Sequence, residues 1–485
     1  MKTGFLRFMK ERQQVNCFML FSIIAVVICV LMRVFYTFPF SYPDTGSYVL
    51  SAVTGSFNVY RPMGYSNYLR FLHCISDSIY FIFYVNYVLL FLSEMFLVFS
   101  VKYLAKINNT AVFILFGLLL LTNARLVFAC NLLMSDGIFS IMSIVSFTLL
   151  LWLVYKPSYF IALVSMILMV LMCRVRYSGL FFIPVTALVY FLSFKEKNKY
   201  IHLLFTLLPL LTGVYIYSST KQDFKNNTHV DSFSGFGGWQ SINNASVLLP
   251  EAKQIPLSKF KSQQLKSLHS FIQSCPDDMF QDKYAMSTNY MWNNDLPYKI
   301  YNRYLLDHSS RDYQTQWAAS GKLFGEYSKV LIKEYPFRYA SKYVLPSIVS
   351  NFKFKAFEEN SIDFENEPMY QQYYGLTEDK YTQSCKFFEI IEPIRKILQI
   401  CLWIIMLASS VLFLLTTKKG ALKDKTYILK LSMLLTLLVV LGGQSLSSPN
   451  TTWRYTLPLF APMISFICCE CDRLLGALRI KNGAE

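Results

Sequence analysis

The chain has little charge and few histidines for its length. Only 16% of its 485 residues are Asp, Glu, Lys or Arg, whereas soluble domains carry about 25%. This shortage excludes a soluble enzyme with one hydrated surface, and an aromatic content of 17% excludes a disordered chain. The five His are scattered, and most of the 11 Cys lie in apolar runs or near the C-terminus. No structural zinc site is therefore predicted.

Long apolar runs are what the chain has in abundance. Hydrophobic residues make up 54% of it, in repeated runs of roughly 18 to 22 residues, long enough to cross a bilayer. The first run follows a basic segment without a small-residue cleavage site, so it reads as a retained span. We expect about ten transmembrane helices, near 17–38, 79–101, 110–123, 137–155, 158–173, 178–194, 200–217, 397–416, 427–443 and 455–471. The predicted fold class is an all-α polytopic membrane protein.

The net charge of +16 reflects an excess of Lys and Arg, and the placement of these residues predicts the orientation of the helices. Lys and Arg collect before the first predicted span and after the second, fourth, sixth, eighth and last, all on one side if both termini are cytoplasmic. The loop 39–78 and the polar segment 218–395 then lie outside. We expect three parts: a transmembrane domain over 1–217, an extracytoplasmic mixed or mainly helical domain over 218–395, and C-terminal transmembrane helices over 396–485.

The polar segment contains three features of interest. Its stretch 321–357 has the pattern of an amphipathic helix near the membrane. The glycine-rich stretch 234–240 predicts a flexible outer loop, with sugar stacking on Trp239 as a minor alternative. Cys275 and Cys385 are the cysteines of this outer segment and are predicted to pair in an oxidising compartment.

Several arginines lie where the positive-inside rule does not place them. They fall in the predicted outer loops, together with Asp44 and Asp136. Each one alone could be an interfacial anchor. However, arginine suits phosphate because its planar guanidinium donates paired hydrogen bonds and keeps its charge. A set of outer arginines beside hydrocarbon therefore favours a lipid-linked phosphate; these residues are Arg61, Arg125, Arg174, Arg176 and Arg454.

The first outer loop carries the turn Pro43-Asp44-Thr45-Gly46 directly after the first span. Asp44 could cap the helix that follows, or it could be a general base at the membrane surface. The string D-T-G-S also occurs in aspartic proteases, which need two such aspartates. The chain has no second D-T-G, so this reading is excluded.

The order of short motifs resembles that of the C-type (GT-C fold) membrane glycosyltransferases, which include protein O-mannosyltransferases and bacterial aminoarabinose transferases. The motifs are P-D-T-G-S-Y (43–48), R-P-M-G-Y-S (61–66), L-M-S-D (133–136), R-Y-S-G-L (176–180) and R-Y-T-L-P (454–458). The resemblance covers roughly 1–217 and 397–471. Thr45 replaces the acidic neighbour usual for the first-loop aspartate, which leaves metal dependence open.

The resemblance implies transfer of a sugar from a polyprenyl phosphate to an acceptor hydroxyl, with inversion, on the extracytoplasmic face of a bacterial inner membrane. The catalytic candidates are Asp44, as base, and Asp136. Tyr455 joins the five arginines as a candidate phosphate ligand, and Tyr48, Tyr65 and Trp239 are candidate sugar or acceptor contacts. The acceptor is a glycan, a lipid or a protein. No cofactor and no nucleic-acid partner are expected, and a divalent metal stays open.

Three other classes compete with this interpretation. A polysaccharide polymerase or ligase would also use lipid-linked sugars at the outer face. A secondary transporter would be expected to show paired halves and broken helices, and neither is visible in the sequence. A structural or receptor protein would have no use for the clustered arginines and aspartates.

Overall fold

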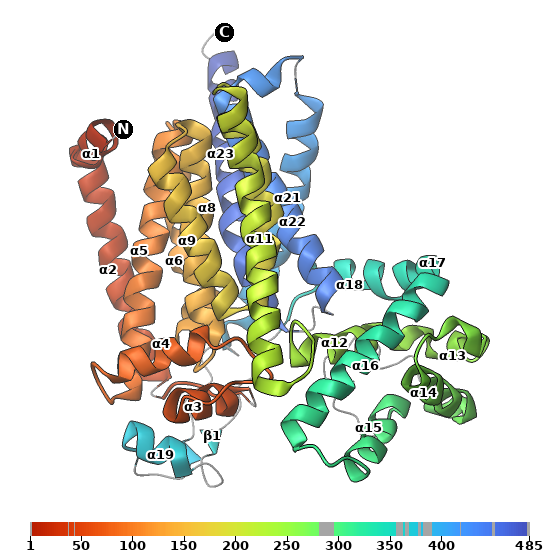
Figure 1. Cartoon of the computed structure of the whole chain (residues 1–485). Coiled ribbons are helices and arrows are strands. Elements are labelled where there is room, and N and C mark those ends of the chain that lie inside the picture. Colours follow the sequence, from red (N-terminus) through yellow and green to blue (C-terminus); the bar gives the residue numbers. More distant parts are fainter. Residues whose placement is uncertain are drawn as a thin grey trace.

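The computed structural model is built almost entirely from helices. It describes residues 2–36, 38–42, 44–280, 295–355, 362–363, 368–376, 380–381, 390–417, 419–448 and 452–482. Long apolar helices lie side by side in one bundle (Figure 1). They are α2 (Arg12–Phe35), α5 (Ile79–Ala105), α6 (Thr110–Leu121), α7 (Ala124–Cys130), α8 (Ser135–Tyr155), α9 (Tyr159–Val175), α10 (Phe182–Phe194), α11 (Lys199–Thr228), α21 (Glu392–Leu415), α22 (Lys425–Ser447) and α23 (Leu457–Asn482).

The number of membrane-length helices is smaller than the sequence predicts. Seven helices of the described residues are long and apolar enough to cross a membrane, and eight if the bent α6–α7 pair is one span. Helix α9 has only 17 residues, and α23 places Glu470, Asp472 and Arg473 in its second half. These charges shorten its apolar run. The structure agrees with the predicted all-α polytopic class, but the count of about ten is not confirmed.

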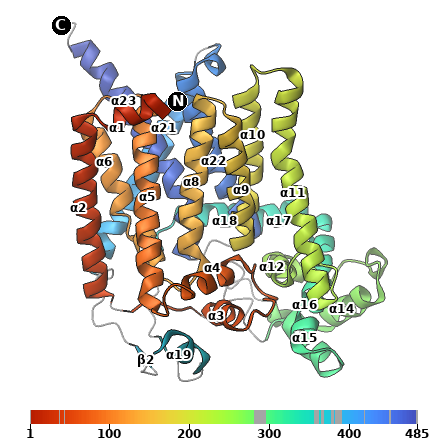
Figure 2. The ribbon, with the colours of Figure 1, turned by 60° about the vertical axis from the view of Figure 1, so that its left-hand side comes forward.

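The two ends of the bundle differ in what they carry. Both chain termini, with the short α1 (Lys2–Met9), lie at one end (Figures 1 and 2). The other end, called the loop end below, carries the elements of the first loop and two short 3-10 turns. These elements are α3 (Thr45–Thr54), α4 (Gly64–His73), η1 (Tyr177–Phe181) and η9 (Trp453–Thr456).

A second group of helices, called the appended unit below, lies at the loop end and has an apolar core of its own (Figure 1). It consists of α12 (Gly235–Ala245), η2 (Ser246–Leu248), α13 (Leu249–Ala252), η3 (Leu257–Lys259), α14 (Gln263–Ser274), η4 (Asp277–Met279), α15 (Pro297–Asp307), α16 (Tyr313–Glu334), α17 (Pro336–Tyr339) and the π-turn η7 (Ala340–Val344). The next helix, α18 (Leu345–Ser350), packs against α22 of the bundle. Helix α11 is continuous across the predicted boundary at 217/218 and reaches this unit.

The glycine-rich stretch is a helix, so the prediction of a flexible loop at 234–240 is wrong. Ser234 caps α12 by accepting a hydrogen bond from the Gly237 N–H at 2.9 Å. A Cβ on Gly238 would lie 1.6 Å from the carbonyl oxygen of Gly321 in α16. The glycines let two helix backbones approach closely, and this packing offsets the helix propensity they lack.

Two further expectations for the polar segment have mixed outcomes. The stretch 321–357 is helical in large part, but it is divided among α16, α17, η7 and α18 instead of forming one amphipathic helix. Cys385 of the predicted disulfide lies outside the described residues, and Cys275 donates to the Phe271 carbonyl at 3.3 Å. The described strands are the antiparallel pair β1 (Ile362–Asp363) and β2 (Lys380–Tyr381), near α19 (Pro368–Tyr374).

Candidate functional site

The loop end brings together charged side chains from four distant parts of the sequence. Asp44 and Arg61 belong to the first loop, Asp136 to the first turn of α8, Arg176 to the extended residue after α9, and Arg454 to η9. Each position is at the end of a span, where a polar side chain can leave the hydrocarbon region. The carboxylate of Asp136 also lies in the first helical turn, where the helix dipole favours negative charge.

Backbone contacts fix the first loop against the start of α8. The Phe40 N–H donates to the Asn131 carbonyl at 2.8 Å, and the Leu133 N–H donates to the Phe40 carbonyl at 2.9 Å. The segment before Asp44 is therefore tied to the segment before Asp136.

Asn58 performs a similar role for Arg61. Its buried side-chain carbonyl accepts hydrogen bonds from the Tyr60 and Arg61 N–H groups at 2.9 and 3.0 Å. Its amide donates to the Ser47 carbonyl in α3 at 2.9 Å. This Asx-type turn sets the direction in which the Arg61 side chain leaves the loop.

Aromatic residues of the appended unit also pack against the turn at Tyr60 and Arg61. The Tyr60 ring packs edge-on against Trp317 at 4.7 Å between centroids, and the guanidinium of Arg61 lies 4.7 Å from the Phe236 ring. Trp239 stacks on Trp317 at 5.4 Å and donates to the Trp317 carbonyl at 3.1 Å. Trp239 is thus buried in the core of the unit and supports the loop, instead of facing a sugar as the sequence predicts.

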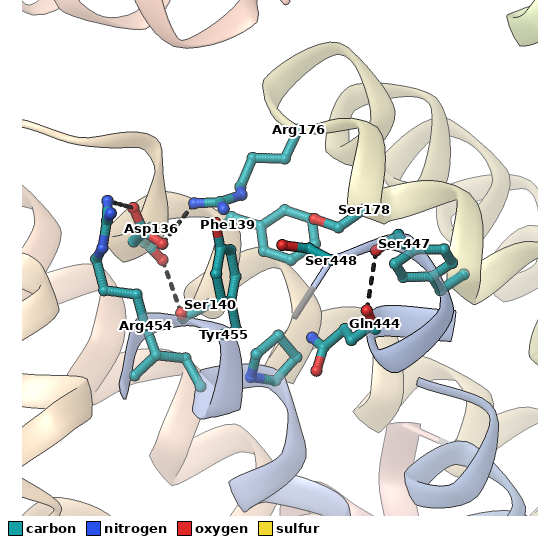
Figure 3. Close-up of a pocket in the computed structure, with 13 residues that line it drawn as sticks. Asp136, Phe139, Ser140, Arg176, Ser178, Gln444, Ser447, Ser448, Arg454 and Tyr455 are labelled. Atoms are coloured by element: carbon teal, nitrogen blue, oxygen red, sulfur yellow. Dashed lines mark hydrogen bonds and ion pairs between the residues drawn. The ribbon is translucent and has the colours of Figure 1, made fainter. Parts of the chain in front are cut away.

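The charged groups form three ion pairs, two of which share Asp136. Arg61 pairs with Asp44 at 2.8 Å. Asp136 binds Arg176 through one carboxylate oxygen and Arg454, at 3.5 Å, through the other (Figure 3). Three guanidiniums therefore face two carboxylates, which leaves one formal positive charge.

The charged side chains of this cluster are largely shielded from solvent. The side chain of Asp136 is 2% exposed, against 12% for Arg454 and 21% for Arg176. Arg454 Nε is buried without a hydrogen-bond partner in the described residues. A buried charge is tolerated when it is paired, and here one carboxylate compensates two arginines. A donor of Arg454 remains for a further acceptor.

Asp44 is ionised in this setting. Burial would raise the pKa of its carboxyl, but Arg61 above all, and then Arg454 and Arg176, outweigh burial and hold the pKa below the ordinary value. The same attraction raises the pKa of Arg61 despite burial. The Asp44 side chain makes no hydrogen bond to the N-terminus of α3, so the helix-cap interpretation is not supported.

A small cavity lies against Asp136, Arg176 and Arg454. Its volume is about 60 Å³, the space of about two water molecules. Tyr455, a predicted phosphate ligand, also lines this cavity. Its other polar lining residues are Ser140, Ser178, Gln444, Ser447 and Ser448 (Figure 3). The polar end of α22 was missed in the sequence, although its run G-G-Q-S-L-S-S closes an apolar span.

A larger cavity of about 730 Å³ lies on the other side of the first loop. Arg61 lines it, together with Arg174 and apolar side chains of α4, α8 and α9 such as Phe71 and Met142. Arg174 is paired with Asp223 of α11 at 2.9 Å. It therefore does not join the Asp136 cluster, and its predicted role as a phosphate ligand stays a prediction.

The predicted sugar contacts Tyr48 and Tyr65 are buried beneath the cluster. Their rings pack edge-on at 4.9 Å, and the Tyr48 hydroxyl lies 3.0 Å from Ser135 Oγ. Ser135 Oγ in turn accepts from Arg176 at 3.4 Å. Tyr48 thus supports the residue before Asp136 and does not reach either cavity surface.

Arg125 is separated from the cluster. It donates to Thr456 Oγ1 at 3.0 Å and lines a different cavity. The sequence could not place it, because the chain bends between α6 and α7 just before this residue.

Among the described residues, no group of three His, Cys, Asp or Glu side chains could hold a metal ion. In the cluster itself, guanidinium groups occupy the positions that a cation would take beside Asp44 and Asp136. The arrangement instead places guanidinium donors beside two carboxylates, with a small cavity next to Asp136.

The chain matches no family model, no curated protein and no solved structure at the level required for similarity. The resemblance to C-type glycosyltransferases therefore rests on the short motifs alone and stays a prediction.

Proposed function

We propose that the chain is a membrane glycosyltransferase that moves a sugar from a polyprenyl phosphate to an acceptor hydroxyl. The observation that carries this proposal is the convergence of Asp44, Asp136, Arg61, Arg176 and Arg454 at one end of an apolar bundle. These residues belong to the motifs that suggested the family, and the fold brings them to one place.

The chemistry of such a transfer matches the charges present. As the bond between the sugar and the phosphate breaks, negative charge grows on the departing phosphate oxygen. Guanidinium donors aimed at that oxygen stabilise this charge. Arg176 and Arg454 border the small cavity, and Arg454 Nε has no hydrogen-bond partner in the described residues, so these two groups are our candidates to receive an oxygen of the departing phosphate.

Asp44 is the base of the proposed reaction. The acceptor hydroxyl loses its proton as its oxygen bonds to the anomeric carbon, and a carboxylate within reach accepts that proton. The lowered pKa keeps Asp44 ionised at neutral pH. Attack opposite to the departing phosphate inverts the anomeric centre.

The larger cavity is our candidate site for the sugar and the first part of the lipid chain of the donor. Its volume of about 730 Å³ suits a sugar with part of a lipid chain, and Arg61 belongs both to this cavity and to the ion pair with Asp44. In this proposal the loop end faces the periplasm or the exterior of a bacterial inner membrane, and the acceptor is a glycan, lipid or protein.

The test is sugar transfer by the purified full chain with a panel of labelled polyprenyl-phosphate sugars. Asp44→Asn should lower transfer by about 100-fold or more, as expected for a lost general base. Asp77→Asn is the matched control, because Asp77 is an exposed acid of the same loop. Consumption of none of the labelled donors, or normal transfer by Asp44→Asn, would contradict the proposal. Successive additions to one acceptor would instead indicate a polymerase.

A further inference from the structure

A polar cavity lies in the appended unit, among the segment after α11, the start of α14, α15 and α16. Its volume is about 610 Å³, within the range of about 300–1,000 Å³ that is usual for sites of small molecules. Such sites are mostly apolar, with a few polar groups. Here all the described lining residues carry polar side chains except four, which are Val230, Leu305, Ala319 and Leu323. This lining favours a ligand that is rich in hydrogen-bonding groups.

Two buried polar side chains of α16 form the inner wall of this polar cavity. Gln316 is 7% exposed and Ser320 is 1% exposed. Ser309 Oγ donates to Gln316 Oε1 at 2.8 Å, and Gln316 Nε2 donates to Ser320 Oγ at 3.2 Å. Each amide nitrogen of this kind has two hydrogens, and a hydroxyl that accepts a bond can still donate one. The inner wall therefore holds oriented donors that a ligand oxygen can use.

Charged side chains of both signs border the same cavity nearer the surface. Asp231, Arg311 and Lys322 are exposed, and Glu326 is half-buried. The carboxylates accept hydrogen bonds, whereas the arginine and the lysine donate them. A ligand of one charge would meet repulsion as well as attraction here. A hydroxyl group, which both donates and accepts, suits all four side chains.

The polar cavity and the larger cavity meet at the end of α11. Asp223 and Asn227 in the last turns of this helix line the larger cavity. His229 and Asp231, which follow directly, line the polar cavity. A chain of linked units bound in the polar cavity would thus lie close to the cavity proposed for the donor.

We infer that the polar cavity binds a neutral oligosaccharide and holds it as the acceptor beside the donor cavity. The role as acceptor rests on the proposed function, whereas the binding of the oligosaccharide does not. Sugar hydroxyls match a wall of mixed donors and acceptors, and the ring of Tyr301, which also lines the cavity, adds an aromatic surface. A peptide fits less well, because peptide sites offer apolar pockets or an exposed sheet edge, and the described walls are helical and mainly polar.

The test of binding uses the purified full chain without any donor. Its ligands are fluorescently labelled linear hexasaccharides of glucose, mannose, galactose or N-acetylglucosamine, and fluorescence anisotropy measures their binding. At least one hexasaccharide should bind to the wild-type chain. Gln316→Leu removes the amide of the inner wall and should weaken this binding by about tenfold or more. Arg311→Gln, at an exposed position, should weaken it by a smaller factor.

Gln273→Leu is the matched control. Gln273 is a partly buried glutamine of α14 that lies outside the polar cavity and donates to the Lys253 carbonyl at 3.0 Å. Its replacement should leave hexasaccharide binding unchanged, so a loss in this variant as large as that in Gln316→Leu would overturn the assignment of the cavity.

Further results decide against the site or for it. Binding of none of the four hexasaccharides, or equal binding by the wild-type chain and both cavity variants, would overturn the inference. Tighter binding of a serine- and threonine-rich hexapeptide would also overturn it, and would assign the cavity to a protein acceptor. If Gln316→Leu fails to fold, as judged by gel filtration, Arg311→Gln decides: weaker binding supports the site, and unchanged binding overturns it.

The role as acceptor is tested separately, by sugar transfer to the hexasaccharide that binds. Gln316→Leu should raise the KM for this hexasaccharide and leave kcat unchanged, because the side chain binds the acceptor away from the reacting atoms. Hexasaccharide binding without consumption of any donor would support the site and contradict the transferase. Transfer to another acceptor by a chain that binds no hexasaccharide would do the reverse.

Discussion

Arg125 is buried and Arg454 largely so, and both are associated with the short turn η9, but the environments of their charges differ. Arg454 lies against the carboxylate of Asp136, which also binds Arg176. Arg125 has hydroxyl and carbonyl acceptors and a second arginine nearby. The positive charge of Arg454 is compensated in part by a carboxylate of the chain itself, whereas no described carboxylate lies within ion-pair distance of Arg125.

This difference separates two uses of the same residue type. In the Asp136 cluster the protein supplies its own counter-charge, so arginine orientation is set before any ligand arrives. Such preorganisation is what stabilisation of a developing negative charge requires. Arg125 is held by neutral hydrogen-bond acceptors of the described residues, so its orientation is fixed without a carboxylate.

The largest loss of stability is expected when the carboxylate shared by Arg176 and Arg454 is removed. Asp136→Asn keeps the shape but leaves two buried arginines uncompensated, so the free energy of unfolding should fall by roughly 3–5 kcal/mol. Thermal unfolding in detergent, followed by tryptophan fluorescence, measures this loss. A stability equal to that of wild type would mean that solvent, and not Asp136, balances these arginines.

A smaller contrast is expected when each arginine is replaced by Met, which is apolar and similar in length. Arg454→Met leaves Asp136 with Arg176, so a loss of about 1–2 kcal/mol is expected. Arg125→Met should change stability by less than about 1 kcal/mol, because it also removes a buried charge that no described carboxylate pairs. Parallel urea or thermal unfolding curves compare the two variants. Equal losses would erase the distinction between the two sites.

The smallest effect concerns pH. In the wild-type chain Arg61 holds the pKa of Asp44 low, so a transfer that needs ionised Asp44 should decline only at a pH below the usual range of an aspartate. In Arg61→Gln the effect of burial remains and the main attraction is lost. The pKa of Asp44 should rise, and the acid limb of the rate profile should move to higher pH. An acid limb at the same pH in both enzymes would show that Asp44 is not the titrating base.

The sequence identified candidate charged residues, but it did not predict which of them lie together in the fold. The rule that basic residues stay on the cytoplasmic side singled out five arginines, and three of them do converge with the two aspartates. It could not sort out Arg125 or Arg174, because a bend in one span and a partner on another helix decide their positions. Such long-range packing leaves no local pattern.

The appended unit shows the same limit in its glycines. Local propensity predicts a loop around Gly235 and Gly238, since glycine weakens an isolated helix. The helix forms because α16 presents Gly321 at the facing position, 83 residues along the chain from Gly238, where two backbones can meet. Neither glycine segment alone predicts this helix–helix contact. For the same reason Trp239 looked like a binding residue and is a core residue.

Helix α11 has a mechanical consequence. It runs without interruption from Lys199 in the bundle to Thr228 beside the appended unit, a rod of about 45 Å at 1.5 Å per residue. The appended unit is therefore joined to the bundle by a continuous helix and not by a flexible linker, so a rotation of the unit would also move α11. Asp223 of α11 forms an ion pair with Arg174, and both residues line the larger cavity. A movement of α11 would therefore change the shape of this cavity.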